Sequence, residues 1–349
     1  MTRQTWTALV SAVVFVALAI LLVAIPVPFV TWSPGGARDT LGQIDDKPVI
    51  EISGIPTYPT TGRLDMTIVQ GTPAEGWLSL PEALLDYWRP HHDTFPRDSI
   101  YAPGKSPDEL QAEDTEMMET AQDDAIVAAL QAAGEPVTEM PVVHSVTIGG
   151  AAHNRLRPGD LVESVDGVPT PDVDSVGRRI RSHGLGERVP FVVLRDHQPT
   201  EVSVTTVESA TQPGVSVVGV TLGVGYEYKP RISFELGRKI GGPSAGLVFA
   251  VAIYDKITEG PLLEGKHVAG TGSITPNGDV GGIGAIQEKV AAADSEGATA
   301  FLVPDANCAD LVGVKTNMIL IRVKTLGDAI GAVSDLQTPE RTASIPRCS

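Results

Sequence analysis

Several common kinds of site are excluded because the residues that build them are scarce. The 349 residues include only two cysteines, Cys308 and Cys348, too few for a cysteine-rich metal site or a disulfide framework. In an oxidising compartment the two can form one disulfide, and two free thiols are the alternative. His91 and His92 have no further histidine or cysteine at ligand spacing, so we expect a solvated loop there and no metal site.

Basic residues are also in short supply. There are 26 Lys and Arg against 43 Asp and Glu, which gives a net charge of −17. Such a chain repels phosphate backbones, and no basic stripe with interleaved aromatic residues offsets this, so we expect no nucleic-acid partner. Gly104-Lys105-Ser106 lacks the first glycine of a P-loop, and the pairs Gly270-x-Gly272 and Gly282-x-Gly284 lack the third glycine of a dinucleotide fingerprint. We therefore expect no nucleotide and no other cofactor.

One long segment near the N-terminus has no charge at all. Residues 4–37 are uncharged, and residues 6–25 are almost continuously apolar, which is enough for one helix across a bilayer. The proline-rich sequence that follows lacks a small-residue cleavage site and favours an uncleaved anchor over a signal peptide. We expect Trp6 and Trp32 at the membrane interfaces. Arg3 predicts a cytoplasmic N-terminus with the rest of the chain outside the cytoplasm.

The next hundred residues alternate between strand and helix patterns. PVIEISG, ending at Gly54, and GRLDMTIVQG, ending at Gly71, predict a small hairpin. Ser106 followed by Pro107 predicts the start of an acidic helix that runs to about Gly134. These residues carry no independent functional signal, and we expect them to support the other domains or to close a catalytic groove.

A different pattern begins at Pro141. The strand PVVHSVTI is followed by LRPGDLVESVDGVP, an amphipathic helix over residues 173–182, and two strands, VPFVVLRD and TEVSVTTV. This order, with Pro158-Gly159-Asp160 and Asp166-Gly167, resembles a PDZ domain of the bacterial, protease-associated kind. The resemblance implies that an extended peptide adds a strand to a sheet edge. A module that only packs on its neighbour is the alternative.

The expected peptide groove faces the helix over residues 173–182. Its strand residues are expected to be Val142, Val143, His144, Ser145 and Val146. The Gly-Leu-Gly-Phe loop that holds a terminal carboxylate is not evident upstream of Val142.

The candidate nucleophile is Ser244. It lies in GGPSAG, just before an apolar run that predicts a helix of three turns. A serine at such a helix start is close to unpaired backbone amides that suit a developing oxyanion, although a plain capped turn has the same pattern. Gly242-x-Ser244-x-Gly246 also matches the nucleophile elbow of α/β-hydrolases. The only later histidine, His267, follows too closely for that fold, and an esterase pairing Ser244 with His267 is kept as an alternative.

Without a histidine, the base must be another residue. Lys289 lies on a predicted helix whose Ile286, Val290 and Ala293 share one side. Burial among apolar residues lowers the pKa of a lysine by desolvating the cation. Lys289 can then take the proton of Ser244 in a Ser-Lys variant of the catalytic triad.

Three motifs in order resemble the proteolytic domain of Lon-type Ser/Lys proteases. They are GPSAG, ending at Gly246, GTGSITPNGDVGGIGAIQEK, ending at Lys289, and FLVP, ending at Pro304. The resemblance implies Ser244 as nucleophile, Lys289 as general base and Thr271 as the hydroxyl that holds the amine. Gly242 and Pro243 support the turn. Gly241 replaces the acidic residue of ATP-dependent members, and the chain has no ATPase module.

The whole order resembles membrane-anchored PDZ–Lon proteases of Gram-positive, actinobacterial-like bacteria. It implies an α+β multidomain chain: a transmembrane anchor over residues 1–30, a strand and helix region over 31–134, a β-rich PDZ domain over 135–210, a Lon-type α/β proteolytic domain over 211–335 and a tail over 336–349. The expected function is ATP-independent, membrane-tethered endopeptidase activity on unfolded or extended extracytoplasmic or membrane-associated proteins. A noncatalytic PDZ adaptor at the membrane is the alternative. A homo-oligomer is compatible with the resemblance.

Overall fold

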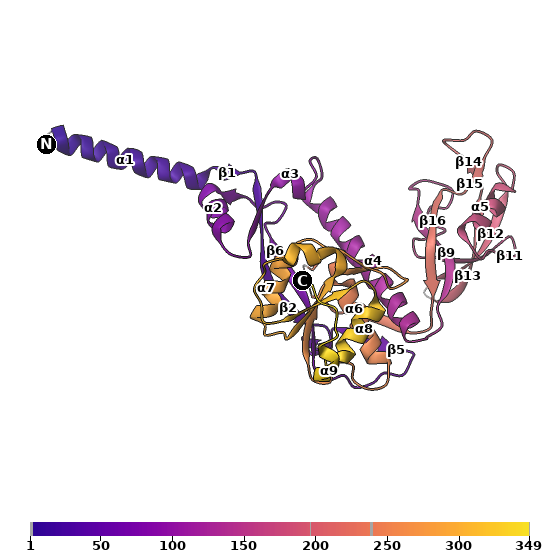
Figure 1. The fold of residues 1–349 in the computed structure, drawn as a ribbon. Helices are drawn as coiled ribbons and strands as arrows, with labels where there is room; N and C mark the ends of the chain where they lie inside the picture. Colours follow the sequence, from indigo (N-terminus) through magenta and orange to yellow (C-terminus); the bar gives the residue numbers. More distant parts are fainter. Residues whose placement is uncertain (1–2, 196, 238–239, 349) are drawn as a thin grey trace. The chain divides into compact units, whose positions relative to one another are not determined.

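The computed structural model describes residues 3–195, 197–237 and 240–348 (Figure 1). The chain forms two compact units. A composite unit joins Met1–Gly134 to Arg231–Ser349, and Glu135–Pro230 form an inserted unit. This division differs from the expected boundaries, because residues 31–134 do not form a region of their own and the inserted unit extends beyond residue 210.

The first helix, α1 (Arg3–Ala24), has no buried residue. It is drawn as one uninterrupted helix in Figure 1. Among the described residues it is the helix that is long and apolar enough, by length and composition, to cross a membrane. At 1.5 Å per residue it is about 33 Å long, which matches the hydrocarbon thickness of a bilayer.

The composite unit is built on one sheet with the strand order β22-β21-β18-β6-β2-β8. β18, β21, β22 and β6 pair in parallel, whereas β2 pairs antiparallel with both β6 and β8. The sheet thus takes half of its strands from the first hundred residues and half from the last hundred. The bounds are β2 (Phe29–Asp39), β6 (Arg63–Gly71), β8 (Asp93–Pro96), β18 (His267–Gly270), β21 (Ala300–Pro304) and β22 (Ile319–Val323).

The predicted hairpin between the segments ending at Gly54 and Gly71 is wrong. β5 (Ile50–Ser53) pairs with β17 (Arg231–Phe234) instead, and β6 enters the middle of the large sheet. The reason lies in the run Leu64, Asp65, Met66 and Thr67, whose four side chains are all buried. Such a run suits a strand covered on both faces rather than a hairpin with one solvated face.

Helices cover this sheet and carry the site. α6 (Gly246–Ile257) is almost wholly buried, α4 (Pro107–Ala132) packs against it, and α7 (Ile286–Ser295) packs against β2 and β6. The acidic helix begins as the sequence predicts, because Ser106 and Glu109 form a capping box. The smaller elements are β1 (Pro26–Val27), β3 (Gln43–Ile44), β4 (Lys47–Pro48), β7 (Leu78–Ser79), α2 (Leu80–Trp88), α3 (Arg97–Ile100), η1 (Pro243–Ala245), β19 (Ser273–Ile274), β20 (Val280–Gly281), η2 (Asp305–Leu311), α8 (Leu326–Asp335) and α9 (Pro339–Thr342).

The inserted unit is an antiparallel sheet with the order β13-β12-β10-β9-β16, and β11 pairs with β10. α5 packs Val176 and Ile180 into a core that includes Phe191. The helix forms where the sequence predicts it, with Asp172 as its N-cap. The bounds are β9 (Thr138–Val146), β10 (Leu161–Val165), β11 (Val168–Pro169), α5 (Val173–Arg181), β12 (Arg188–Arg195), β13 (Gln198–Thr205), β14 (Val207–Glu208), β15 (Ser216–Val217) and β16 (Val220–Glu227).

The two tryptophans expected at membrane interfaces have different surroundings. Trp6 is exposed on α1. Trp32 lies on β2, where its ring meets Phe95 edge to face at 4.9 Å between centroids and approaches Gly284. Trp32 is therefore part of the packing of the composite unit, and the expectation that it faces a membrane is wrong.

Candidate active site

The turn that presents Ser244 is shaped by its neighbours. Gly242 has φ +86°, a left-handed conformation that favours glycine, and its amide donates to the carbonyl of Asp114 at 3.3 Å. Pro243 then begins the short helix η1, which continues directly into α6. Ser244 is thus held, half-buried, at the start of a buried helix.

The segment after β18 fixes this turn from the other side. The carbonyl of Ser244 accepts a hydrogen bond from the amide of Gly272 at 2.8 Å and another from Thr271 Oγ1 at 2.9 Å. The carbonyl of Gly272 in turn accepts a hydrogen bond from the amide of Leu247 at 3.0 Å. A Cβ at Gly272 would lie 3.2 Å from that of Leu247, so only glycine allows the two segments to approach this closely.

Lys289 supplies a buried amine on α7. Its residue is 5% exposed, and burial lowers the pKa of Lys289 to about 8, although the adjacent charge of Glu288 opposes the shift. A substantial fraction of the side chain is therefore neutral near pH 8. Only this neutral form can accept a proton from a serine hydroxyl.

Thr271 connects the amine to the serine turn. Lys289 Nζ donates to Thr271 Oγ1 at 3.2 Å, while the same hydroxyl gives its one hydrogen to the Ser244 carbonyl. Because the hydroxyl has already donated its hydrogen, it can only accept a hydrogen bond from Lys289, and the amine must be the donor. This leaves the nitrogen lone pair of a neutral Lys289 free to point elsewhere in the site.

Ser244 and Lys289 line the same cavity, which has a volume of about 140 Å³. His267 is not among the described residues that line it, and its Nε2 instead lies 2.8 Å from Asp65 Oδ2. The geometry therefore favours the Ser-Lys pair over the Ser-His alternative. The other lining residues are Met66, Thr67, Ile68, Val69, Met118, Ile240, Gly241, Gly242 and Ala245.

Five of these lining residues come from β6 and α4, for which the sequence offered no functional signal. Residues 66–69 belong to β6 and Met118 belongs to α4. β18 pairs with β6 only as far as Met66, opposite Gly270. Beyond that point the β18 side of β6 borders the cavity. The LDMTIV segment alternates between apolar and polar residues, which indicates a strand but not its central place in the sheet.

Glu288 is a second buried ionisable group beside the base. It is 1% exposed, and neither carboxyl oxygen has a hydrogen-bond partner among the described residues. Burial, together with the neighbouring Asp93, raises the pKa of Glu288 to about 7. Sequence reasoning treated Glu288 only as part of a motif, because nothing in the sequence indicates its depth.

The predicted groove strand of the inserted unit is wrong. β9 has a partner on each side, since Val142 pairs with Leu161 of β10 and with Gly223 of β16. A strand with two partners has no edge to offer a peptide. The sequence prediction stopped at residue 210 and so missed β16. The displaced groove residues are Val142, Val143, His144, Ser145 and Val146.

A cavity of about 480 Å³ lies instead between α5 and β16. Val173, Gly177 and Ile180 line it from the helix, and Val220 and Leu222 line it from the strand. β16 ends the order of the sheet, so one of its edges is unpaired within this sheet. Residues 216–219, which include β15 and end just before β16, also line the cavity.

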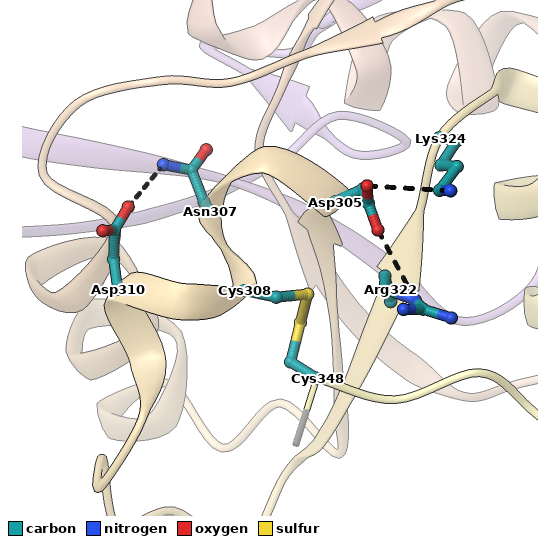
Figure 2. Close-up of a disulfide and its surroundings, with 7 residues drawn as sticks. All are labelled: Asp305, Asn307, Cys308, Asp310, Arg322, Lys324 and Cys348. Carbon is teal, nitrogen blue, oxygen red and sulfur yellow. Dashed lines mark hydrogen bonds and ion pairs between the residues drawn. A yellow bond between two sulfur atoms is a disulfide. The ribbon is translucent and has the colours of Figure 1, made fainter.

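Cys308 and Cys348 form a disulfide, with 5.0 Å between their α-carbons (Figure 2). The bond ties the C-terminal segment to η2. Asn307, next to Cys308, holds the loop before α7 through two hydrogen bonds of 2.9 Å with the backbone of Ile283. Figure 2 also shows Asp305 between Arg322, at 3.6 Å, and Lys324, at 3.8 Å. The disulfide thus anchors the helix that supports the start of α7.

No cluster of three or more His, Cys, Asp or Glu that could hold a metal ion occurs within the described ranges. His92 instead lies 3.5 Å from Asp86 in an ion-pairing position. The cavity itself is lined by the hydroxyl of Ser244, the amine of Lys289 and the backbone of the serine turn. These groups define the class as serine hydrolases that use a lysine base.

Comparison with known proteins agrees with this class. Residues 239–333 match the family model of the Lon protease (S16) C-terminal proteolytic domain. Lon protease 2 of Syntrophobacter fumaroxidans is 34% identical over 110 residues, which is 30% of this chain and 14% of that protein. The Lon protease of Rhizobium meliloti is 40% identical over 103 residues, or 28% and 12%. Lon protease 2 of Bacillus subtilis is 33% identical over 107 residues, or 31% and 19%.

The chain spans less than a fifth of the length of these curated relatives. Solved structures that resemble part of it include the PDZ domain of an SdrC-like protein from Listeria monocytogenes, with 21% identity, a TM-score of 0.22, and coverage of 24% of this chain and 86% of that one. The second domain of the listeria protein Lin2157 has 24% identity, a TM-score of 0.23, and coverage of 24% and 83%. The predicted mixed α+β class and the resemblance to the Lon proteolytic domain are confirmed.

Proposed function

We propose that this chain is an ATP-independent, membrane-tethered serine endopeptidase with Ser244 as nucleophile and Lys289 as general base. One observation carries the proposal. A buried amine with a pKa of about 8 is held by Thr271 against the turn that presents Ser244, and both residues line one cavity. A nucleophile and a base that line one cavity, with the pKa of the base shifted toward the working pH, are what nucleophilic catalysis requires.

The chemical steps follow from this geometry. Neutral Lys289 takes the proton of Ser244 as Oγ attacks the scissile carbonyl, and the resulting ammonium gives that proton to the leaving amine. Water, deprotonated by the same lysine, then hydrolyses the acyl-enzyme and restores both groups. Backbone amides at the start of the η1 and α6 segment are without acceptors inside the helix and suit the developing oxyanion.

The substrate enters as an extended segment. The part of β6 that extends past its pairing with β18 lines the cavity with residues 67–69. A peptide lying along this edge brings its carbonyls toward Ser244 in the manner of an added strand. A folded protein cannot offer a free strand, so the substrates are unfolded or locally extended proteins.

The inserted unit recognises peptides as a PDZ-type module and selects or gates substrates. Its groove lies between α5 and β16, where an unpaired strand edge borders the cavity of about 480 Å³. A homo-oligomer remains a prediction from the resemblance to Lon-type domains.

The composite unit works outside the cytoplasm. α1 tethers it, and Arg3 precedes the span as the positive-inside rule requires of a cytoplasmic end. The disulfide between Cys308 and Cys348 supports the same orientation, because such bonds persist in oxidising compartments. The substrates are therefore extracytoplasmic or membrane-associated proteins.

The test uses the full chain in nanodiscs without nucleotide. Casein, an unstructured protein, is incubated with the wild type, Ser244→Ala, Lys289→Ala and the matched control Ser273→Ala. Cleavage by the wild type and the control alone supports the proposal. A Ser244→Ala chain that still degrades casein contradicts it, and binding of casein without cleavage by any version supports a noncatalytic adaptor.

A further inference from the structure

Helix α2 presents its large apolar side chains to the outside. Trp88 is 75% exposed, Tyr87 68% and Trp77, just before the helix, 63%. A surface helix of a soluble domain buries its apolar stripe and exposes its polar one. The exposed apolar residues of this patch, called the α2 patch below, are Trp77, Leu80, Leu84, Leu85, Tyr87 and Trp88.

The side of α2 that faces the protein is formed by other residues. Ala83 is the buried residue of α2. Asp86 is largely covered and lies 3.3 Å from Arg89 and 3.5 Å from His92. Glu82 is used in a capping box with Ser79. The apolar side chains of α2 are therefore not a misplaced core face; they form a separate surface.

This surface begins where the membrane span ends. α1 ends at Ala24, and β1 follows almost at once with Pro26 and Val27. β1 pairs with β7, Pro26 opposite Ser79, and Ser79 is the N-cap of α2. Paired strands lie about 4.8 Å apart, so the first turn of α2 is held next to the point at which α1 leaves the bilayer.

The patch also carries the residues that membrane interfaces favour. Tryptophan and tyrosine concentrate at the level of the lipid headgroups because one end of each ring is apolar and the other polar. The guanidinium of Arg97 stacks over Trp77 at 4.9 Å and over Tyr101 at 5.3 Å. Arg89 follows directly after α2. Cations beside exposed aromatic rings match anionic headgroups.

We propose that the α2 patch lies in the interface of the membrane that α1 crosses, as a second contact with an anionic lipid bilayer. The proposal rests on the membrane span of the proposed function. With α1 alone, the composite unit is attached to the bilayer at one point. With α2 also bound, two contacts fix its orientation relative to the bilayer.

Single-tryptophan versions of the full chain test this in vesicles of phosphatidylcholine and phosphatidylglycerol with brominated acyl chains. Bromine quenches tryptophans that touch the lipid. The version that keeps only Trp88 is expected to lose most of its emission, as is the one that keeps only Trp6. The version that keeps only Trp32, which packs against Phe95, is expected to retain it.

An unquenched Trp88 overturns the proposal. An unquenched Trp6 separately overturns the span, so the two failures are distinguishable. In the Trp88-only chain, Leu84→Gln with Leu85→Gln should reduce quenching severalfold, because both side chains are exposed and their replacement spares the core. Val312→Gln, at an even more exposed apolar position outside the patch, is the control and should leave quenching unchanged. Equal quenching in both variants also overturns the proposal.

Discussion

Thr271 Oγ1 lies 3.2 Å from Lys289 Nζ and accepts its hydrogen bond. Thr271 is 1% exposed. The same hydroxyl donates a hydrogen bond to the carbonyl of Ser244. In the proposed mechanism the threonine holds the amine in place relative to the serine, and no step moves a proton through its hydroxyl. Thr271 is thus proposed as a positioning residue that acts through Lys289.

Thr271→Val should lower kcat by about a hundredfold, because a displacement of about 1 Å in a reacting group has that effect. Thr271→Ser keeps the hydroxyl and should restore most of the activity. The variants are compared by steady-state cleavage of a fluorogenic casein, with thermal unfolding as a check of the fold. Equal activity in the valine and serine variants contradicts the positioning role.

Activity should rise with pH through the pKa of Lys289, which burial lowers to about 8. Below this pKa the amine is protonated and cannot act as a base; above it the rate levels off. The profile of kcat/KM between about pH 6 and pH 10 measures this. A flat profile with chemistry as the slow step argues against Lys289. Glu288→Gln removes an adjacent negative charge and should move the rise to lower pH.

The buried lysine should also cost stability. Its pKa is 10.5 when unfolded and about 8 when folded, so the unfolded chain binds the extra proton between these values. Stability then increases as pH rises from 8 toward 10.5, and the full penalty, about 3 kcal/mol, applies at pH 7. Lys289→Met should raise the free energy of unfolding by about this amount at pH 7, as measured with urea. Lys324 is exposed, so Lys324→Met serves as the control and should change the free energy of unfolding little.

The disulfide should stabilise the composite unit. It closes a segment of 40 residues, for which chain entropy gives at most about 4 kcal/mol. Cys308→Ser with Cys348→Ser should lower the free energy of unfolding by about 2 to 4 kcal/mol. Reductant should lower the free energy of unfolding of the wild type by the same amount and leave that of the double variant unchanged. A wild type that is insensitive to reductant would show that the bond does not carry this stability.

The relocated groove of the inserted unit predicts a contrast between two strands. Leu222 lines the cavity beside α5, whereas His144 is exposed on the doubly paired β9. Leu222→Asp should raise KM for casein severalfold with kcat unchanged, because the substitution weakens peptide docking and spares the dyad. His144→Ala should leave both constants unchanged. A higher KM for His144→Ala with no change for Leu222→Asp would indicate that the peptide binds at β9.

The residues of the proposed catalytic site stand out in the sequence because they lie in short, ordered motifs. Ser244 is fixed by the glycine and proline just before it, and Thr271 and Lys289 belong to one continuous segment. Helices α1, α4, α5, α6 and α7 were likewise set by local signals, namely periodicity, caps and apolar runs.

Strand neighbours could not be predicted in this way. Alternation in β6 indicates a strand, yet nothing local indicates that its partners are β2 and β18 rather than β5. β16 was missed for the same reason, because it pairs with β9 across more than seventy residues. The exposed apolar face of α2 could not be predicted either, because an apolar segment does not indicate whether protein or lipid covers it.

The large sheet has a consequence for how the protein is made. β6 can pair with its parallel partner β18 only after β18 has been synthesised, about 200 residues later in the chain. Pairing over such a separation is slow, since a long loop must close before any contact forms. Part of the cavity lining comes from the first hundred residues, and the proposed base, Lys289, follows more than 200 residues later. The cavity that holds the proposed dyad is therefore complete only when most of the chain has been synthesised.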